Sequence, residues 1–298
     1  MNFGDKYFKI LDITNNYRTN EKEIIQMVED RVEEEIIKFW KGLIKYNVQI
    51  ITHAHIVYKE GVPPTFVGPI DFKIPEKYSY REFHAFSMNI SRIMHLYQEL
   101  FREPLINFNL HINASSPYKN ALIKLKDCVF AESIIILLIS TIEVFLEDTF
   151  RKIARILEIN TLDLRLIKKF LKLFNIDIKL KRRKKKLLAS NLSSILPNRM
   201  DFQRSENCKI AYKLVGIDIP ALNNSLWEHI FASKNSNSIL SRRNSIIHAL
   251  TRTLQRLDIT KEDVRNDIEK TCEFIFNIEV KMIELFSDKI RPDFFYFS

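Results

Sequence analysis

The sequence predicts an all-α protein, a multi-helix bundle, on three observations. No Gly or Pro occurs between Tyr118 and Leu196, and a stretch that long without a backbone breaker does not suit short strands and tight turns. Apolar residues recur at steps of three and four, the period of an amphipathic helix. The 298 residues include only five glycines, which excludes the Gly-rich phosphate loops of nucleotide-binding α/β folds.

The first two helices are predicted over residues 20–58 and 79–102, with a kink in the first near Gly42. Eight apolar residues lie on one face of that first helix: Ile25, Val28, Val32, Ile36, Phe39, Leu43, Tyr46 and Ile50. The Pro/Gly cluster in 60–78 indicates a connector, and the Asn- and Ser-containing stretch 104–117 indicates a boundary. We therefore expect an N-terminal helical hairpin, residues 1–116, of unknown role, followed by a second domain over 117–298.

The second domain is expected to be built around one long apolar helix, residues 118–157. Ser140, Glu143 and Glu147 recur on one side of it, which sets two carboxylates along an otherwise apolar helix. The last helix, 260–289, opens with a capping pattern at Thr260 and Asp263. Shorter helices are predicted between these two, at 161–174, 183–196, 201–214 and 221–233 and from about Ser238.

Charge is distributed unevenly along the chain. Residues 1–116 carry 14 Lys/Arg against 15 Asp/Glu, whereas residues 117–298 carry 32 against 22. The whole excess of +9 therefore comes from the second half, where it would attract RNA, DNA or an acidic protein. The alternative is that a basic surface serves solubility alone.

Cysteine usage and hydropathy indicate a cellular location. The three cysteines are far apart without C-x-x-C spacing, so neither a disulfide framework nor a zinc site is predicted. The most apolar segment, residues 133–142, is shorter than the ~20 residues needed to cross a bilayer. We expect a soluble cytoplasmic protein with no membrane partner, no metal and no cofactor.

The strongest local signal is the stretch 241–250. On a helix, Asn244, His248 and Arg252 lie on one face, at spacings of four residues. Arg243 and His248 are five apart, about 140° around the helix and ~7.5 Å along it. They could flank a bound phosphodiester but are poorly placed to bond each other, so a second copy of the chain could complete the site.

Two motifs resemble the HEPN superfamily. The string Arg243-Asn244-x-x-x-His248, near the start of a late helix, resembles the R-x(4–6)-H signature in its Arg-Asn form. The helix segment 137–148, LLISTIEVFLED, is similar to the "alE-x-FL-x-D" helix of RiboL-PSP-type HEPN families. Together the matches cover about 117–290, which implies a HEPN-type core in the second domain.

The resemblance implies a metal-independent endoribonuclease, a toxin or effector in prokaryotic antiviral defence. It implies a homodimer with the two Arg243/His248 motifs facing each other, and an antitoxin or sensor protein as a further partner. RNA cleavage without metal needs proton transfer at the ribose 2′-hydroxyl and the leaving oxygen, which suits His248, and a cation for the phosphate, which suits Arg243. Asn244 would orient the phosphate or the histidine, and Glu143 would hold Arg243.

Other cations are candidate RNA contacts. Seven of the eight residues 179–186 are Lys or Arg, a run that is either an RNA-binding edge or a solvated loop. Arg242 and Arg252 could contact substrate phosphates or only water. The predicted RNA-binding set is therefore Lys181, Arg182, Arg183, Lys184, Lys185, Lys186, Arg242 and Arg252.

Each candidate catalytic residue also has an alternative, non-catalytic role. Arg243 could belong to a solvated helix face and His248 could be a structural histidine. The protein would then be a catalytically silent helical adaptor that binds RNA or an acidic protein. The N-terminal helices could also sense a ligand and switch a nuclease on.

Overall fold

A computed structural model describes residues 34–48, 55–57, 65–67, 80–100, 116–176, 190–232, 237–252 and 259–290. The chain divides into two compact units, Met1–Glu76 and Lys77–Ser298. The second unit contains both α4 (Arg81–Glu99) and α5 (Ser116–Ala154), which pack together through aromatic side chains. The expected domains, 1–116 and 117–298, stay a prediction.

The first unit contains helix, a 3₁₀ turn and a strand pair within its described residues. Helix α3 spans Glu34–Leu43, and Phe39 and Leu43 of the predicted apolar face are buried. The prediction of one helix to residue 58 is wrong beyond the 3₁₀ turn η1 (Ile44–Tyr46). Asn47 adopts a left-handed φ of 58° and its N–H donates to the Ile44 carbonyl, which ends the helix. Strands β1 (His55–Val57) and β2 (Thr65–Val67) then pair antiparallel.

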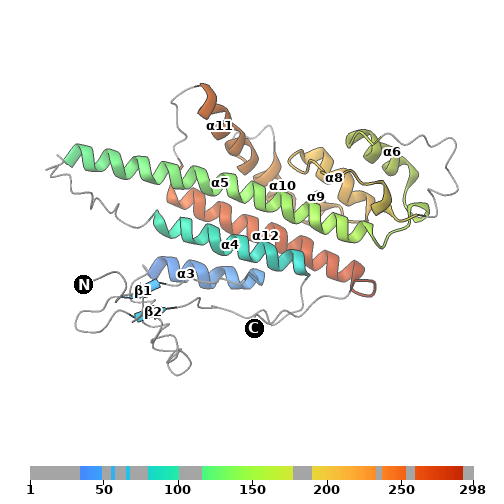
Figure 1. The fold of residues 1–298 in the computed structure, drawn as a ribbon, viewed down its shortest axis with the longest axis horizontal. Helices are drawn as coiled ribbons and strands as arrows, with labels where there is room; N and C mark the ends of the chain where they lie inside the picture. The colour runs from blue at the N-terminus through green and yellow to red at the C-terminus, as the bar shows by residue number, and fades with distance from the viewer. Residues whose placement is uncertain are drawn as a thin grey trace, which may run out of the picture. The chain divides into compact units, whose positions relative to one another are not determined.

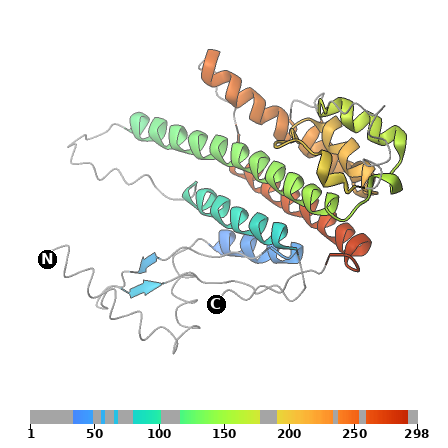
Figure 2. The same ribbon diagram turned by 45° about the vertical axis from the view of Figure 1, so that its right-hand side comes forward.

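Three long helices form the core of the second unit. Helices α4, α5 and α12 (Lys261–Phe286) contact one another in all three pairs and run side by side (Figures 1 and 2). Phe83 and Phe86 of α4 pack against Phe145 of α5, with ring centroids 6.5 and 5.8 Å apart. The all-α prediction for this unit is confirmed, as are the two long helices predicted at 118–157 and 260–289.

Helix α5 contains a segment, Ile123–Ala154, long and apolar enough to cross a membrane by length and composition alone. Half of its most apolar window is buried inside the bundle. Ile135, Leu138, Ile142 and Leu146 are among its fully or nearly fully buried residues. One such helix is weak evidence for a membrane span, because the core helix of a soluble protein has the same length and composition.

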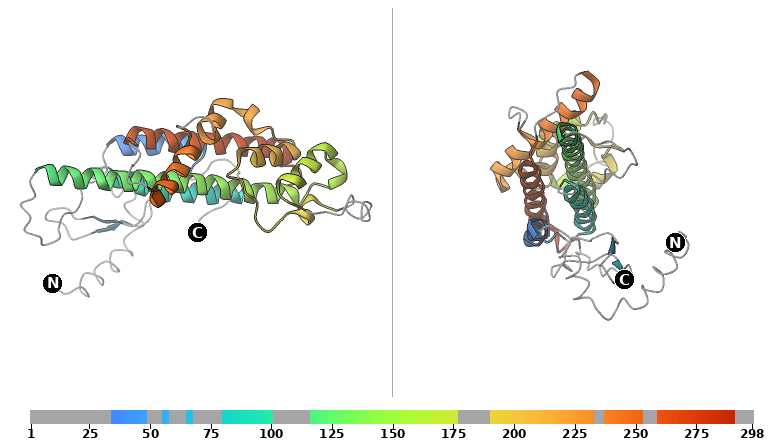
Figure 3. Two further views of the ribbon diagram at one scale, coloured as in Figure 1. Left: turned by 90° about the horizontal axis from the view of Figure 1, so that it is seen from above. Right: turned by 90° about the vertical axis from the view of Figure 1, so that its left-hand side faces the viewer.

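Shorter elements follow α5 in the chain. They are η2 (Ile159–Thr161), α6 (Leu164–Leu173), η3 (Leu192–Ile195), α8 (Ser205–Leu214), α9 (Ile219–Leu222) and α10 (Asn224–Phe231). η3 and α8 contact α5 and α6 contacts α8, whereas α10 contacts α11 and α12. Figure 3 shows α6 and α8 together at the end of the second unit where α5 ends. Phe150 of α5 meets Phe170, Phe202 and Tyr212 with ring centroids 5.6–6.1 Å apart, and the Tyr212 hydroxyl donates to the Leu146 carbonyl.

Two of the predicted short helices differ from the structure. Of the helix predicted at 183–196, residues 183–189 lie outside the described residues, and the rest contains only the short turn η3. The helix predicted at 221–233 is two helices, α9 and α10. They are separated at Asn223, whose extended backbone (φ −160°) ends α9 while its side chain accepts from the Leu226 N–H to cap α10.

Candidate functional site

Helix α11 (Ile239–Arg252) carries the Arg-Asn-x-x-x-His motif. Ser238 begins it: its buried hydroxyl accepts from the Ser241 N–H, as a capping serine does. Ile239 and Ile246 are buried, and α11 contacts α5 and α10. Its C-terminal end points away from the other helices (Figures 1 and 2). One face of α11 is therefore fixed to the bundle while the opposite face is open to a partner.

Arg243 lies on the α5 side of α11. It is half-buried, and its Nη1 donates to Oδ1 of Asn244 at 3.0 Å. Its Nε is buried and has no hydrogen-bond partner within the described part of the chain. Burial raises the pKa of Glu143 on α5, and the charge of Arg243 opposes that rise. The expectation that Glu143 holds Arg243 stays a prediction.

Glu143 itself is held by a residue that sequence reasoning missed. Gln203, just before α8, donates from Nε2 to Oε2 of Glu143 at 2.6 Å. Burial raises the pKa of Glu143, while the hydrogen bond from Gln203 lowers it and the charge of Asp201 raises it. Nothing local in the sequence marks Gln203, because it reaches Glu143 only through the fold.

The neighbouring carboxylate of α5 fixes the segment that carries Gln203. Oε1 of Glu147 accepts from Nε and Nη2 of Arg151 at 2.9 and 2.7 Å, and from the Met200 N–H at 3.3 Å. Arg151 also donates to the carbonyls of Pro197 and Asn198 at 2.7 and 2.8 Å. Glu147 is therefore a structural partner, and the 197–203 segment is tied to α5 at several points.

Arg242 lies on the other flank of α11, among α10 and α12. Its Nη2 donates to Oδ1 of Asp267 at 2.5 Å, and the same oxygen accepts from Nε2 of His229 at 3.0 Å. Asp267 is 1% exposed and the Arg242 side chain 13%. Arg242 is thus engaged in an ion pair inside the protein, and its predicted contact with RNA phosphates stays a prediction. Asp267 and His229 were not singled out by their sequence context.

His248 is exposed, as is Asn244. The helical geometry separates His248 from Arg243 by about 140°, so the two side chains leave α11 in different directions. The backbone of Arg252 lies on α11, but its side chain and the whole basic run 179–186 lie outside the described residues. Those RNA-contact predictions therefore remain predictions.

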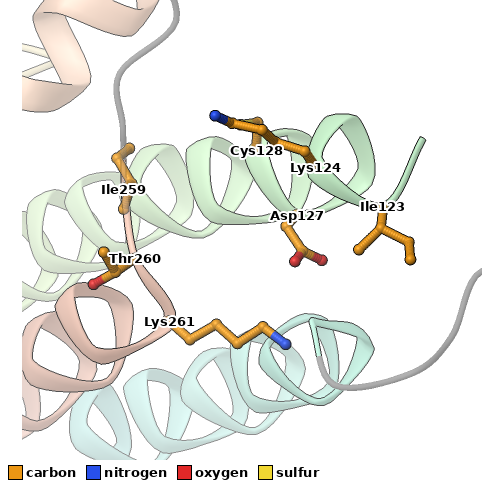
Figure 4. A pocket seen from close by; sticks show the side chains of 7 residues that line it. All are labelled: Ile123, Lys124, Asp127, Cys128, Ile259, Thr260 and Lys261. Carbon is orange, nitrogen blue, oxygen red and sulfur yellow. The ribbon is translucent and has the colours of Figure 1, made fainter. Parts of the chain in front are cut away.

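A cavity of about 300 Å³ lies elsewhere, between the N-terminal part of α5 and the start of α12. In Figure 4 the side chains of Asp127 and Lys261 point toward the same space. Its other lining residues are Ile123, Lys124, Cys128, Ile259 and Thr260. None of the predicted site residues lines it. Within the described residues, no group of three or more His, Cys, Asp or Glu is placed to hold a metal ion.

Comparison with protein families decides the identity of this fold. The model of the RiboL-PSP-HEPN family matches residues 98–284, from the end of α4 to the last turns of α12. The chain belongs to the RiboL-PSP-HEPN family. The match covers the acidic-apolar helix α5 and the motif helix α11, so the HEPN resemblance is confirmed. Neither the curated proteins nor the solved structures give a match to this HEPN-family protein.

Proposed function

We propose that this HEPN-family protein is a metal-independent endoribonuclease. The observation that carries the proposal is the arrangement on α11: Arg243 is half-buried beside the carboxylate of Glu143, while His248 is exposed on another side of the same helix. HEPN membership supports an RNase-related function. A fixed cation and an accessible imidazole are the two groups that cleavage through the ribose 2′-hydroxyl needs.

In this mechanism His248 takes the proton from the 2′-hydroxyl, whose oxygen attacks the adjacent phosphorus. Arg243 donates hydrogen bonds to the phosphate oxygens and stabilises the charge that develops on them. The bond to the 5′-oxygen breaks as that oxygen accepts a proton from an acid, and the products carry a 2′,3′-cyclic phosphate and a 5′-hydroxyl. Asn244 orients Arg243, to which it is hydrogen-bonded.

The acid and the base are two copies of His248 in a homodimer. Within one chain Arg243 and His248 diverge by about 140°, so a second copy is needed to bring an imidazole to each phosphate. Exposed apolar side chains on α5 give such a dimer an apolar surface: Leu137 and Val144, 39% and 50% exposed, lie on either side of Glu143 in sequence. We place the protein in the cytoplasm as a toxin or effector of antiviral defence, held in check by an antitoxin or a sensor protein.

The test is cleavage of total RNA and tRNA by the purified protein in EDTA. The wild type should cleave and leave cyclic-phosphate ends, and Arg243→Ala and His248→Ala should each lower the rate by at least about a hundredfold. Arg92→Ala is the matched control, since Arg92 is an exposed arginine of α4 whose Nη1 donates to Oδ1 of Asn89 on the same helix at 3.4 Å. Equal cleavage by all four proteins would refute the proposal.

The second candidate is a catalytically silent adaptor that binds RNA. It is favoured by the exposure of Asn244 and His248 on α11, two polar side chains that can contact RNA without cutting it. Binding of RNA by the wild type, with no cleavage under any condition and no dimer in solution, would select it.

A further inference from the structure

Helix α6 is held on the second unit by its apolar side. Ile167, Phe170 and Leu171 are buried, and α6 contacts α8. The ring of Phe170 lies 5.6 Å from that of Phe150 on α5 and 4.7 Å from that of Phe174. The opposite side of α6 is therefore presented to solvent in a fixed orientation.

That opposite side is cationic. Arg165, Lys168 and Lys172 follow one another at steps of three and four, so they share one helical face, and all three are exposed. We call these three residues the α6 basic face. No hydrogen bond or ion pair joins the side chain of any of the three to another residue that the structure describes. The fourth cation, Lys169, pairs with Glu206 of α8 at 2.6 Å.

This arrangement costs helix stability. The ten residues of α6 contain four cations and no acid, and like charges three or four residues apart destabilise a helix. Arg165 also stands in the first turn, where the helix dipole disfavours a cation. Several other described cations in this unit are paired with acids: Arg151, Lys152, Lys213 and Lys281. The α6 basic face is thus an unneutralised charge on a rigid support.

The chain continues from α6 into the basic run 179–186. Residues 164–186 contain eleven Lys/Arg against one acid, Asp177, a formal excess of +10 that exceeds the +9 of the whole protein. The α6 basic face is the described part of this segment. A polyanion that neutralises several of these cations at once would gain from counterion release.

The residue types favour RNA over an acidic protein. The buried centre of a protein–protein interface is depleted in Lys and needs apolar anchors. The α6 basic face is two lysines and an arginine without an apolar residue among them. Nucleic-acid interfaces are much more positive, and their phosphate contacts come mainly from such side chains.

We propose that the α6 basic face contacts the phosphate backbone of RNA, away from the residues that cut it. Helix α6 lies at the end of the second unit where α5 ends, apart from the projecting end of α11 (Figures 1 and 3). An RNA that contacts both the α6 basic face and the projecting end of α11 must therefore run along the helix bundle of the second unit. The inference rests on the proposed function only in taking RNA as the partner, and it deepens that proposal by adding an anchoring surface.

The experiment measures binding of a 2′-O-methyl RNA of about 30 nucleotides, which lacks the attacking hydroxyl and cannot be cleaved. Because each phosphate contact on a single strand contributes about 0.7 to the slope of log Kobs against log salt, Arg165→Gln/Lys168→Gln/Lys172→Gln should reduce that slope by about 2. The affinity at 0.1 M salt should fall by about tenfold or more. Loss of like-charge repulsion should leave this variant at least as stable as wild type, so weaker binding would not reflect unfolding.

The matched control removes three exposed cations from other places in the chain, as Lys38→Gln/Lys124→Gln/Lys289→Gln. It should change the slope by less than 1. An α6 variant with the wild-type slope, or a control with the same loss, overturns the proposal. So does an α6 variant that keeps RNA binding but loses binding to poly-glutamate, which would identify an acidic protein as the partner.

The binding and cleavage experiments together distinguish failure of this inference from failure of the proposed nuclease function. A protein that binds through α6 but never cleaves ordinary RNA retains the surface and refutes the nuclease. A protein that cleaves ordinary RNA, while its α6 variant binds like wild type, retains the nuclease and refutes the surface.

Discussion

Arg242 and Arg243 are consecutive, yet the fold uses them differently. One residue turns a helix by about 100°, so the two guanidinium groups leave α11 on different sides. Arg242 is bound by Asp267 of α12, together with His229 of α10. Arg243 faces the side of Glu143 on α5. The ion pair of Arg242 with Asp267 therefore restrains the rotation of α11, and with it the direction of Arg243 toward α5.

This geometry makes Asp267 a positioning residue. Asp267→Asn should lower the free energy of unfolding by about 2–3 kcal/mol, because the cation of Arg242 stays buried without its counter-charge. It should also lower the cleavage rate per folded molecule by about ten- to a hundredfold, with KM little changed, because small displacements of reacting groups are costly. The backbone amide hydrogens of α11 should exchange with solvent faster in this variant than in wild type.

The control for Asp267 is a partly buried ion pair between two other helices, α4 and α5. Glu82 and Lys152 join α4 to α5 at 2.8 Å, with side chains 17% and 18% exposed. Glu82→Gln should lose stability while it cleaves like wild type and leaves exchange in α11 unchanged. If Asp267→Asn lowers the free energy of unfolding but leaves the cleavage rate per folded molecule unchanged, the role of Asp267 is structural and the positioning assignment is wrong.

At the scale of elements, a buried carboxyl joins the start of α4 to α12. Oε1 of Glu279, a residue 2% exposed, accepts from the Tyr80 N–H at 2.7 Å, and its Oε2 has no hydrogen-bond partner among the described residues. Burial raises the pKa of Glu279 from 4.5 to about 8. Burial also raises the pKa of Tyr80 to about 12. The contact between these helices is therefore made by a carboxyl that stays protonated at neutral pH.

Glu279→Gln should remove a pH dependence of stability. As the pH rises from about 4.5, the unfolded chain loses the Glu279 proton first, so the wild type becomes less stable until its folded state also ionises near pH 8. Each pH unit within that window changes the free energy of unfolding of the wild type, relative to Glu279→Gln, by about 1.4 kcal/mol. Glutamine cannot ionise, so the variant should match wild type near pH 4.5 and exceed it by a few kcal/mol at pH 8.

Guanidinium unfolding at several pH values checks this prediction. Glu284→Gln is the control, since Glu284 lies on the same helix but is exposed and paired with Lys281. It should change stability little at any pH. A constant difference between Glu279→Gln and wild type would mean that Glu279 is already ionised in the folded protein.

At the scale of the whole molecule, the proposed site needs two copies of the chain. A mixed dimer of wild type and His248→Ala retains only one of the two imidazoles that serve as acid and base. We therefore expect excess His248→Ala, after subunit exchange, to lower the cleavage activity of a fixed amount of wild type. Light scattering should show a dimer. Wild-type activity that stays unchanged, although the subunits demonstrably exchange, would mean that each chain acts alone.

Much of the fold could be predicted from the sequence because helices are local. The capping pattern Thr260/Asp263 forms the expected reciprocal box at the start of α12, and the hydrogen bonds from Thr260 lower the pKa of Asp263. The apolar period of α5 predicted its buried face. The exception is the stretch after Tyr46, where apolar residues keep a helical spacing but Asn47 ends the helix and a strand follows.

Only part of the candidate site could be predicted from the sequence. The spacing of Arg243 and His248 on one helix, and the carboxylate of Glu143 on another, could be read directly, since they depend on local periodicity and short motifs. Gln203, His229 and Asp267 could not, because they meet Glu143 and Arg242 only when helices 25 to 60 residues apart in sequence pack together. By itself the sequence determined the helices and the chemistry on each; tertiary packing decided which charges pair inside the protein and which remain for a partner.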